Sequence, residues 1–429
     1  MVLGAGLLLL RIPGLPPWDS LYLDDYGTFF VRALENPWQL FSPQHGYVQV
    51  LPHLVAQLAT YVPLPQVPKV FAVSGAVIAS ACGLYVFHAS AGHIRSLWLR
   101  ALLGMAIVLL PVAPLEIADN TLGAPWYMLL ALFWAVLWRP RTRAGMTVTA
   151  LLAFATAAST TIAVLYAPLL AARLYTLRRP RDHAVTAGWL IGCLAQLPVV
   201  LSTASGGRSP LDDISASGVG LSLSFYGHEV VLPSLGWHLS WWLQSFVGRD
   251  GATAIIATVL AIAFAIIAIA QPRARPFMAV ALLAGFGITV FSTTLVRYVT
   301  TSPPVMINVE FGARYTALPI FLIESAIIVG ADCALRQWRR TRQEPAERPA
   351  LTLPAAVAVM GLIIVMVTSW VPDFRYQNAI RVDYTTGPWQ TIVAMWRRDC
   401  AISRTGEIDV RAIRAIPRPQ VVPCNRVHI

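Results

Sequence analysis

Long apolar blocks recur along the chain and are separated by short polar connections. A helix that crosses a bilayer needs about 20 mainly apolar residues, and these blocks approach or reach that length. The blocks predict spanning helices at residues 67–88, 98–114, 122–138, 184–202, 251–270, 277–297, 315–335 and 351–370. The pattern therefore predicts an all-α polytopic membrane protein.

Two further stretches change the number of predicted crossings. The block 145–176 is too long for one helix, and basic residues flank both of its ends. Because flanks on one side require an even number of crossings, we expect two short helices that meet near Ala158–Thr160. The N-terminal run MVLGAGLLLL is only about half of a spanning helix. We expect either that the natural start lies upstream or that this helix continues through IPGLP, which gives about eleven spans.

The segment 46–64 is apolar enough to suggest another crossing, but its polar residues favour a different placement. Gln49, His53 and Gln57 recur every four residues, which is typical of an amphipathic helix. If this segment crossed the bilayer, the side of every later loop would be inverted. We expect it to lie in the outer membrane interface, with a second interfacial helix over TFFVRALENPWQL.

Composition agrees with a membrane protein and argues against nucleic-acid binding. Only 12% of the residues are charged and 56% are hydrophobic, whereas soluble domains carry about 25% charged residues. The net charge is +11, yet the arginines lie in short clusters between apolar blocks rather than on one face. The positive-inside rule makes these connections cytoplasmic. The clusters are Arg95 with Arg100, Arg139 to Arg143, Arg173 to Arg181, Arg273 with Arg275, and Arg336 to Arg348.

The remaining connections then face outward and carry nearly all of the acidic residues. These connections are the first outer loop 11–66, the short loop 114–121, the long outer loop 203–250, the loop 298–314 and the tail 371–429. We expect a multi-pass domain over residues 1–370 in the cell membrane and an extracytoplasmic tail over residues 371–429.

The cysteines fit an outward-facing tail. Three of them fall within apolar blocks and behave as small hydrophobic residues: Cys82, Cys193 and Cys333. Cys400 and Cys424 both lie in the tail, and we predict that an oxidising compartment lets them form a disulfide. Trp389 and Trp396 in the same tail are candidates to stack on sugars in a small outer cap. Core packing or interface anchoring is the commoner role of tryptophan.

Acidic residues gather at two points of the outer loops. Asp24 and Asp25 open DDYGTFF; a helix N-cap explains one aspartate well but does not require two. Glu116 and Asp119 are three residues apart and would share one face of a helical turn. Solvation and capping are their simpler roles, with Asn120 a candidate cap for the next helix. If the two groups converge on one cavity, the carboxylates are suited to act as a general base or to bind a cation.

The layout of roughly the first 320 residues resembles the GT-C superfamily of integral-membrane glycosyltransferases. The segments YLDDYGTFF, HGYVQVLPHL and GARYTALP carry the resemblance, together with the interfacial helices and the number of spans. The resemblance implies a polyprenyl-phosphate-linked sugar as donor and a glycan, glycolipid or protein as acceptor, on the extracytoplasmic face. It also implies that Asp24 or Asp25, with Asp24 favoured, deprotonates the acceptor hydroxyl, and that the sugar is transferred with inversion.

A lipid-phosphate donor also requires a cationic group near its phosphate. Arg314, where an outer loop enters a span, and Arg297, at the end of the preceding span, are the candidates, since a guanidinium binds two oxygens at once. The alternative for both is snorkelling to the interface. His228 and Glu229 in the long outer loop are further candidates for donor or acceptor contacts, although a loop histidine is more often simply solvated.

Glu324 is the basis of a competing function. It lies near the middle of the span TALPIFLIESAIIVG, where an ionisable group costs at least about 2.5 kcal/mol and is a functional candidate. A proton-coupled transporter or a lipid flippase needs such a carboxylate. Transporters typically show an internal repeat and broken helices at the membrane midplane, and no clear repeat is visible here, which favours the enzyme. A non-catalytic scaffold for envelope assembly is a third alternative, and it leaves both acidic clusters unexplained.

The sequence leaves the cofactor requirement open. A divalent cation is an alternative ligand for Glu116 and Asp119, because some families of the superfamily use one and others, with monophosphate donors, do not. The spacing of two carboxylates does not decide between these alternatives.

Overall fold

Most of the residues that the computed structural model describes are helical, as the apolar periodicity predicts. It describes residues 1–12, 14–22, 24–44, 46–177, 180–204, 222–291, 309–343, 352–375, 387–403, 405–409 and 421–426. The predicted site residue Arg297 and the middle of the long outer loop, residues 205–221, lie outside the described residues.

The chain folds into two compact units, each assembled from separate stretches of sequence. The first unit comprises Met1–Cys82, Ile117–Gly207 and Arg375–Ile429, and the second comprises Gly83–Glu116 and Arg208–Phe374. The tail therefore belongs to the same unit as the first outer loop, from which most of the chain separates it. The predicted division at residue 370 concerns membrane embedding and stays a prediction.

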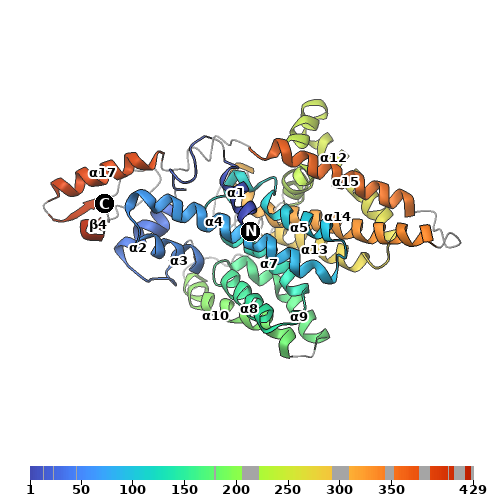
Figure 1. Ribbon diagram of the computed structural model, residues 1–429, viewed down its shortest axis with the longest axis horizontal. Helices are drawn as coiled ribbons and strands as arrows, with labels where there is room; N and C mark the ends of the chain where they lie inside the picture. Colours follow the sequence, from blue (N-terminus) through green and yellow to red (C-terminus); the bar gives the residue numbers. More distant parts are fainter. Residues whose placement is uncertain are drawn as a thin grey trace. The chain divides into compact units, whose positions relative to one another are not determined.

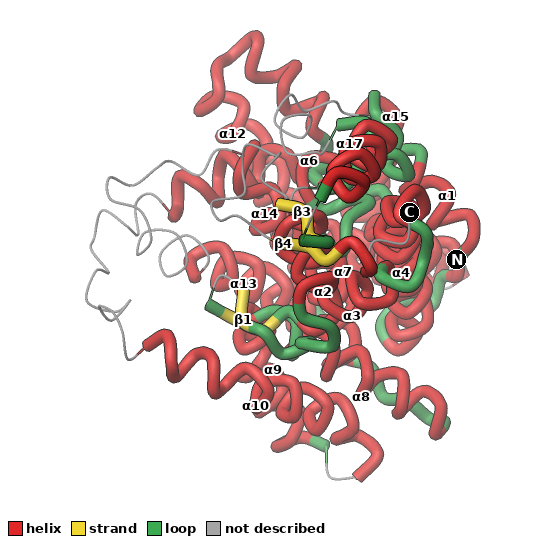
Figure 2. Tube along the Cα trace, turned by 90° about the vertical axis from the view of Figure 1, so that its left-hand side faces the viewer, coloured by secondary structure: helices red, strands yellow, loops and turns green. Residues whose placement is uncertain are grey.

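The first unit is mainly helical and contains two small antiparallel hairpins. Its helices are α1 (Val2–Leu9), η1 (Asp24–Phe30), α2 (Val31–Glu35), α3 (Val50–Ala59), η2 (Leu64–Gln66), most of α4 (Val67–Ala89), α7 (Ala124–Leu137), α8 (Arg143–Ala157), η4 (Thr161–Tyr166), α9 (Ala167–Thr176), η5 (Pro180–His183), α10 (Ala184–Ala204), α17 (Trp389–Ile402) and η10 (Cys424–Arg426). Strand β1 (Pro43–Gln44) pairs with β2 (Tyr47–Val48), and β3 (Glu407–Asp409) pairs with β4 (Val421–Pro423); Figure 2 shows the strands in yellow.

Small residues bring α8 and α10 close together, and the two helices lie side by side in Figure 1. A Cβ atom on Gly188 would collide with the carbonyl oxygen of Ala150, and one on Gly192 would collide with the carbonyl oxygen of Phe154. At the start of α8, the Thr142 hydroxyl accepts a hydrogen bond from the Gly145 amide and so caps the helix.

The block 145–176 divides where the sequence predicts. Helix α8 ends at Ala157, and η4 begins at Thr161 with the Thr160 hydroxyl as its cap. The intervening turn binds the start of α3: the Ala158 carbonyl accepts from the Val50 amide, and the Ser159 hydroxyl accepts from the Leu51 amide. These contacts join two connections that were both predicted to face outward.

The segment 46–64 does not form a spanning helix, as predicted, because α3 has only ten residues. The orientation of its polar side was predicted incorrectly. Gln49, His53 and Gln57 are 1%, 5% and 3% exposed, so the polar stripe faces the interior of the unit rather than the surface. For Gln57 the physical reason is hydrogen bonding inside the loop: its side chain accepts from the Trp38 amide and donates to the Thr60 hydroxyl.

The tail shares one hydrophobic core with the first outer loop. Trp389 and Trp396 of α17 are fully buried against Tyr26 of η1, with ring centroids 5.9 and 6.2 Å from the Tyr26 ring. The Trp389 indole donates to the Leu64 carbonyl, and its amide donates to the Asp19 carbonyl. These tryptophans therefore pack a core, the commoner of their two predicted roles, and do not present free faces to a sugar.

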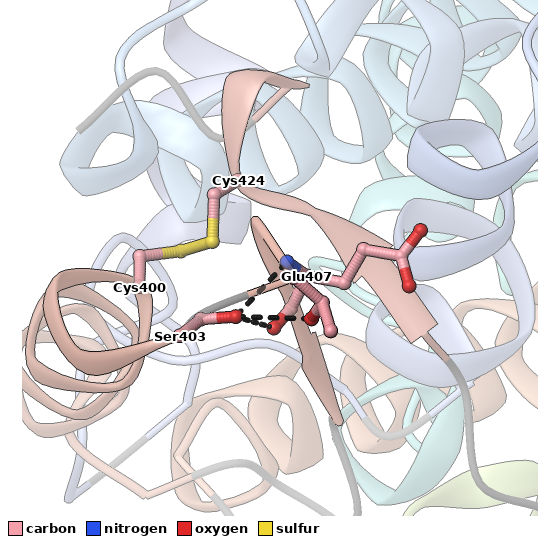
Figure 3. The surroundings of a disulfide bond; sticks show 5 residues. Cys400, Ser403, Glu407 and Cys424 are labelled. Carbon is pink, nitrogen blue, oxygen red and sulfur yellow. Dashed lines mark hydrogen bonds between the residues drawn. A yellow bond between two sulfur atoms is a disulfide. The ribbon is translucent and has the colours of Figure 1, made fainter.

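The predicted disulfide is confirmed. Cys400 at the end of α17 is bonded to Cys424 beside β4, and Figure 3 shows the bridge next to Ser403. The Ser403 hydroxyl accepts from the Glu407 amide and donates to the Glu407 carbonyl, which fixes the turn into β3 (Figure 3). The bridge therefore ties the helix of the tail to its hairpin.

The second unit is a helical assembly around α14. Its elements are the end of α4, η3 (Ser90–Gly92), α5 (Leu97–Val108), α6 (Ala113–Glu116), η6 (Tyr226–Val231), η7 (Leu232–Leu235), α12 (Trp237–Ala270), α13 (Arg275–Phe291), α14 (Val309–Gln343) and α15 (Thr352–Asp373). Residues 316–334 of α14 are buried, and the helix packs against α13, α15 and α5. Figure 1 shows α13, α14 and α15 grouped together.

Helix α12 is bent at Gly248, where φ is 74° and ψ is 172°. An L-residue rarely adopts this conformation, so glycine is required at the bend. The residues after the bend contain the predicted span 251–270, whereas the residues before it belong to the predicted long outer loop. The N-terminus of α12 is capped by Asp373, whose carboxylate accepts from the amides of Trp237 and His238.

Contacts at the two ends of α14 follow the predicted alternation of loops. Asp332 accepts from the amides of Arg95 and Ser96 and pairs with Arg336, which joins two connections predicted to be cytoplasmic. Arg314 lies 18 residues earlier in the helix and pairs with Glu116, which belongs to the loop 114–121 that was predicted to face outward. Eighteen helical residues rise about 27 Å, close to the ~30 Å of bilayer hydrocarbon.

Five helices in the described part of the chain are long and apolar enough to cross a membrane. Two of them expose apolar stripes: Ile255, Val259, Ile262 and Ile269 on α12, and Leu353, Val357, Ile364 and Val371 on α15. Soluble proteins rarely leave such stripes in water. The structure is therefore compatible with an all-α multi-pass membrane protein. Shorter apolar helices lie at several of the other predicted spans, and the number of eleven spans stays a prediction.

Candidate functional site

The two adjacent aspartates open η1 but have different surroundings. Both lie in the first turn of this π-helix, where acidic side chains interact favourably with the helix dipole. Asp24 is half-buried, and its carboxylate accepts a hydrogen bond from the Thr28 hydroxyl at 3.2 Å. Asp25 is only 1% exposed. The pair therefore consists of one carboxylate within reach of solvent and one inside the fold.

Asp25 anchors the segment that precedes α7. Its carboxylate accepts from the Thr121 amide at 3.0 Å, the Thr121 hydroxyl at 2.6 Å and the Leu122 amide at 3.2 Å. Burial raises the pKa of Asp25 to about 7, although these three hydrogen bonds oppose the shift and the neighbouring Asp24 adds to it. The contacts assign Asp25 a positioning role between two predicted outer loops.

The segment held by Asp25 carries the second acidic group, but not in the predicted form. Helix α6 ends at Glu116, and Asp119 follows in a turn with φ at 56°, so the two carboxylates do not share a helical face. A positive φ is uncommon outside glycine, and aspartate and asparagine tolerate it best. The Asn120 side chain accepts from the Gly123 amide in the turn before α7. Gly123 is the N-cap of α7 and no side chain caps this helix, so the predicted capping role of Asn120 was wrong.

Close backbone packing holds this turn in place. A Cβ atom on Gly75 of α4 would lie 2.9 Å from the Asn120 carbonyl oxygen, and one on Gly123 would collide with the Ile117 carbonyl. Asp119 itself is 8% exposed. Within the first unit, the structure therefore brings together Asp25 and the turn that bears Asp119, two of the sequence-predicted groups.

In the second unit, Glu116 pairs with Arg314. The Arg314 Nε lies 3.2 Å from one Glu116 carboxylate oxygen, and the Arg314 amide donates to the other at 3.1 Å. The guanidinium also lies over the Tyr315 ring, 5.4 Å from its centroid. Arg314 therefore contacts both a carboxylate and an aromatic ring, and Glu116 is paired with an arginine.

His228 and Glu229 make side-chain contacts across the bend of α12. Glu229 is 4% exposed and pairs with Arg249, directly after Gly248. Burial raises the pKa of Glu229 to about 7, and the neighbouring Arg249 opposes this shift. The His228 Nε2 lies 2.8 Å from a carboxylate oxygen of Asp250. These contacts join η6 to α12 and explain both residues without a bound substrate.

Glu324 lies in the buried middle of α14, as predicted, and is 0% exposed. Within the described part of the chain, neither of its carboxylate oxygens has a hydrogen-bond partner. An ionised carboxylate in such surroundings is strongly disfavoured, so the neutral acid is the form that this site accommodates.

The sequence did not single out several residues that build these sites. Thr121 holds Asp25, Asp373 caps α12, and Arg249 pairs with Glu229. The one available signal was Asp373, an acidic residue at the outward end of a predicted span. The partners of Asp25 lie 96 and 97 residues away in the sequence, where periodicity carries no information.

The described residues contain no group of three or more His, Cys, Asp or Glu side chains that could hold a metal ion. Glu116, one of the two predicted cation ligands, is paired with Arg314 instead.

Comparison with models of known protein families, with curated proteins and with solved structures finds no match. The resemblance to GT-C glycosyltransferases therefore stays a hypothesis that rests on the sequence motifs.

Proposed function

We propose that the chain is an integral-membrane glycosyltransferase of the GT-C type. It would move a monosaccharide from a polyprenyl-phosphate donor to a glycan, glycolipid or protein of the cell envelope, on the extracytoplasmic face. The proposal includes the predicted topology of about eleven spans with an outward tail. The disulfide of the tail supports an oxidising, outward location for it.

The observation that carries the proposal is the difference in burial and hydrogen bonding between Asp24 and Asp25. Asp25 is buried and fixed by three hydrogen bonds, whereas Asp24 is half-buried on the same rigid turn. A general base must be held firmly and still reach the proton that it removes. Asp24 meets both conditions and is the proposed base, and Asp25 positions it.

The chemistry is a single displacement. The acceptor hydroxyl oxygen attacks the anomeric carbon of the donor while its proton passes to the Asp24 carboxylate. The bond between that carbon and the phosphate oxygen breaks, and polyprenyl phosphate leaves with the bonding electrons. One displacement inverts the configuration at the sugar. From the sequence, Arg314 stays the proposed phosphate-binding residue, because a guanidinium can bind two phosphate oxygens at once.

The proposal predicts that Asp24→Asn lowers sugar transfer by at least about 100-fold, the usual contribution of a general base. Transfer is measured with purified protein in lipid nanodiscs, a panel of polyprenyl-phosphate sugars and envelope acceptors. Glu35→Gln, an acid-to-amide change in α2 of the same loop, is the matched control and should keep activity. An active Asp24→Asn enzyme would remove the base and with it the proposed mechanism.

A second candidate function rests on Glu324. A buried carboxylic acid in a spanning helix is what a proton-coupled transporter or lipid flippase requires. If the wild-type protein forms no glycoside but moves a lipid-linked substrate across liposome membranes, and Glu324→Gln abolishes this movement, the transporter is the correct function. The absence of substrate movement in the same liposomes would exclude it.

A further inference from the structure

Gln49 and His53 lie one helical turn apart at the start of α3. The His53 amide donates to the Gln49 carbonyl at 3.2 Å, which closes the turn between them. Both side chains are buried, at 1% and 5% exposure. Gln49 is the N-cap of α3 and His53 lies in its first turn, so two buried polar side chains come within one turn of chain inside the first unit.

Both side chains end in a buried nitrogen that has no hydrogen-bond partner among the described residues. These atoms are Gln49 Nε2 and His53 Nε2. A buried polar group without a partner costs about 1–3 kcal/mol, so two adjacent ones call for an explanation. Poor packing of α3 is not that explanation, because Gln57, one turn further on, has partners at both ends of its amide.

The two nitrogens differ in hydrogen-bonding character. The Gln49 Nε2 amide nitrogen is a donor. Burial lowers the pKa of His53 to about 4, and nearby Arg32 lowers it further, so the ring is neutral at pH 7. A contact with the Ser42 backbone opposes this shift and raises the pKa, which is the effect of a carbonyl acceptor. One ring nitrogen of the neutral His53 therefore carries the proton and faces Ser42. The other nitrogen is then an acceptor.

A donor beside an acceptor complements a hydroxyl group, which both donates and accepts. A phosphate offers only acceptor oxygens and would be matched by Gln49 alone. The His53 ring also meets Phe29 edge-to-face, with centroids 5.1 Å apart. Phe29 lies on η1, about one turn after Asp24 and Asp25.

We propose that Gln49 and His53 form a hydroxyl-binding site for the transferred sugar, in the same outer loop as the proposed base. This inference rests on the proposed function and deepens it, because it assigns residues to the sugar and not to the lipid phosphate. It also gives a reason for the inward-facing polar stripe of α3, which the interfacial prediction did not anticipate.

The test compares loss of a sugar hydroxyl with loss of a side chain. Sugar transfer in nanodiscs is measured with polyprenyl-phosphate glucose, galactose, mannose and arabinose, and with single-deoxy versions of whichever donor is used. The variants are Gln49→Ala and His53→Phe, with His53→Gln as the conservative replacement. Gln66→Ala, an exposed glutamine of the same loop, is the matched control.

For the wild-type protein and Gln66→Ala, removal of one particular hydroxyl should lower kcat/KM about 10-fold, the effect of one hydrogen bond. In Gln49→Ala and His53→Phe, transfer of the intact sugar should fall by a similar factor, and removal of that hydroxyl should cost nothing further. His53→Gln should recover part of the loss. Such non-additivity is expected only if the side chain and the hydroxyl touch.

Equal deoxy effects in the wild type and both variants, at every hydroxyl, would overturn the proposal and leave a buried water as the partner of the two nitrogens. The same comparison is made without turnover, through stabilisation of the protein against heat by the intact and deoxy donors. If no glycoside forms, the proposed function fails, whereas the hydroxyl site still stands or falls on this binding measurement.

Discussion

At the residue scale, the structure gives two chemically identical neighbours different tasks. Asp24 and Asp25 are indistinguishable by type and nearly so by position. Asp25 faces Thr121 and Leu122, whereas Asp24 contacts Thr28 within its own helix. The environment and not the residue type therefore separates a fixed anchor from a reachable base.

Asp25 should make stability depend on pH. Its folded pKa of about 7 lies above the ordinary value of 3.8, so the folded state holds the proton more tightly than the unfolded state. Its contribution is therefore fully present below pH ~4 and is lost as the pH rises through about 7. Between pH 5 and pH 8 we expect this group to lower the free energy of unfolding by at most about 1.4 kcal/mol per pH unit, and the thermal midpoint in detergent to fall with it.

Replacement of Asp25 by Asn should flatten that slope. It should also lower stability at every pH, because an amide NH₂ would face the amides of Thr121 and Leu122, donor against donor. Glu229→Gln is the comparison, since its pKa of about 7 gives a slope of the same sign. An unchanged slope in Asp25→Asn would show that another group carries the effect.

At the element scale, the bend of α12 explains residues that the sequence offered as substrate contacts. His228 and Glu229 on η6 bind Asp250 and Arg249, just after Gly248. A glycine at the bend avoids the clash that any Cβ atom would cause at this positive φ. The two pairs then hold η6 against the second half of the helix.

We expect Gly248→Ala to destabilise the protein by about 1–2 kcal/mol, because alanine is forced into a left-handed conformation. Gly287→Ala in α13 is the matched control. No atom lies within 4 Å of a Cβ placed there, and its backbone is helical, so alanine should be neutral or slightly stabilising. Thermal unfolding of both variants in detergent measures the difference. Equal midpoints would mean that the bend is not rigid in the protein.

At the scale of the whole molecule, the tail is a structural part of the first unit. Trp389 and Trp396 complete the core beneath η1, and the Cys400–Cys424 bridge fixes α17 to the hairpin of β3 and β4. Tyr26, which these tryptophans contact, directly follows the acidic pair. The tail therefore packs against η1 next to the candidate base.

Loss of the disulfide should weaken the packing of the tail against η1. A disulfide that closes a loop of 24 residues contributes about 3 kcal/mol in the chain-entropy description. We expect Cys400→Ser with Cys424→Ser to lower the thermal midpoint and to speed proteolysis of the tail. Cys193→Ser, which removes a free thiol of α10, is the control. Mass spectrometry of the non-reduced protein should find the two tail peptides linked, and two free thiols there would contradict both the bridge and the outward location.

Hydrophobic periodicity by itself predicted much of the helical framework. It located α4, α7, α10 and α15 within a few residues, and it divided the block 145–176 at the correct turn. The spacing of polar residues identified α3 as non-spanning. The expected compartment identified the two tail cysteines as a pair. These features depend on local composition, spacing and compartment, all of which can be read along one stretch of chain.

Tertiary structure alone decided which partner each polar group meets. The sequence placed Glu116 with Asp119, but Glu116 pairs with Arg314, 198 residues away. It turned the polar side of α3 outward, but Gln49 and His53 point inward. A carboxylate or amide inside a fold is stabilised by whichever donor docking brings near it, and no pattern of apolar positions records that donor. The sequence therefore determined where helices form, and packing between distant segments determined what their polar side chains can do.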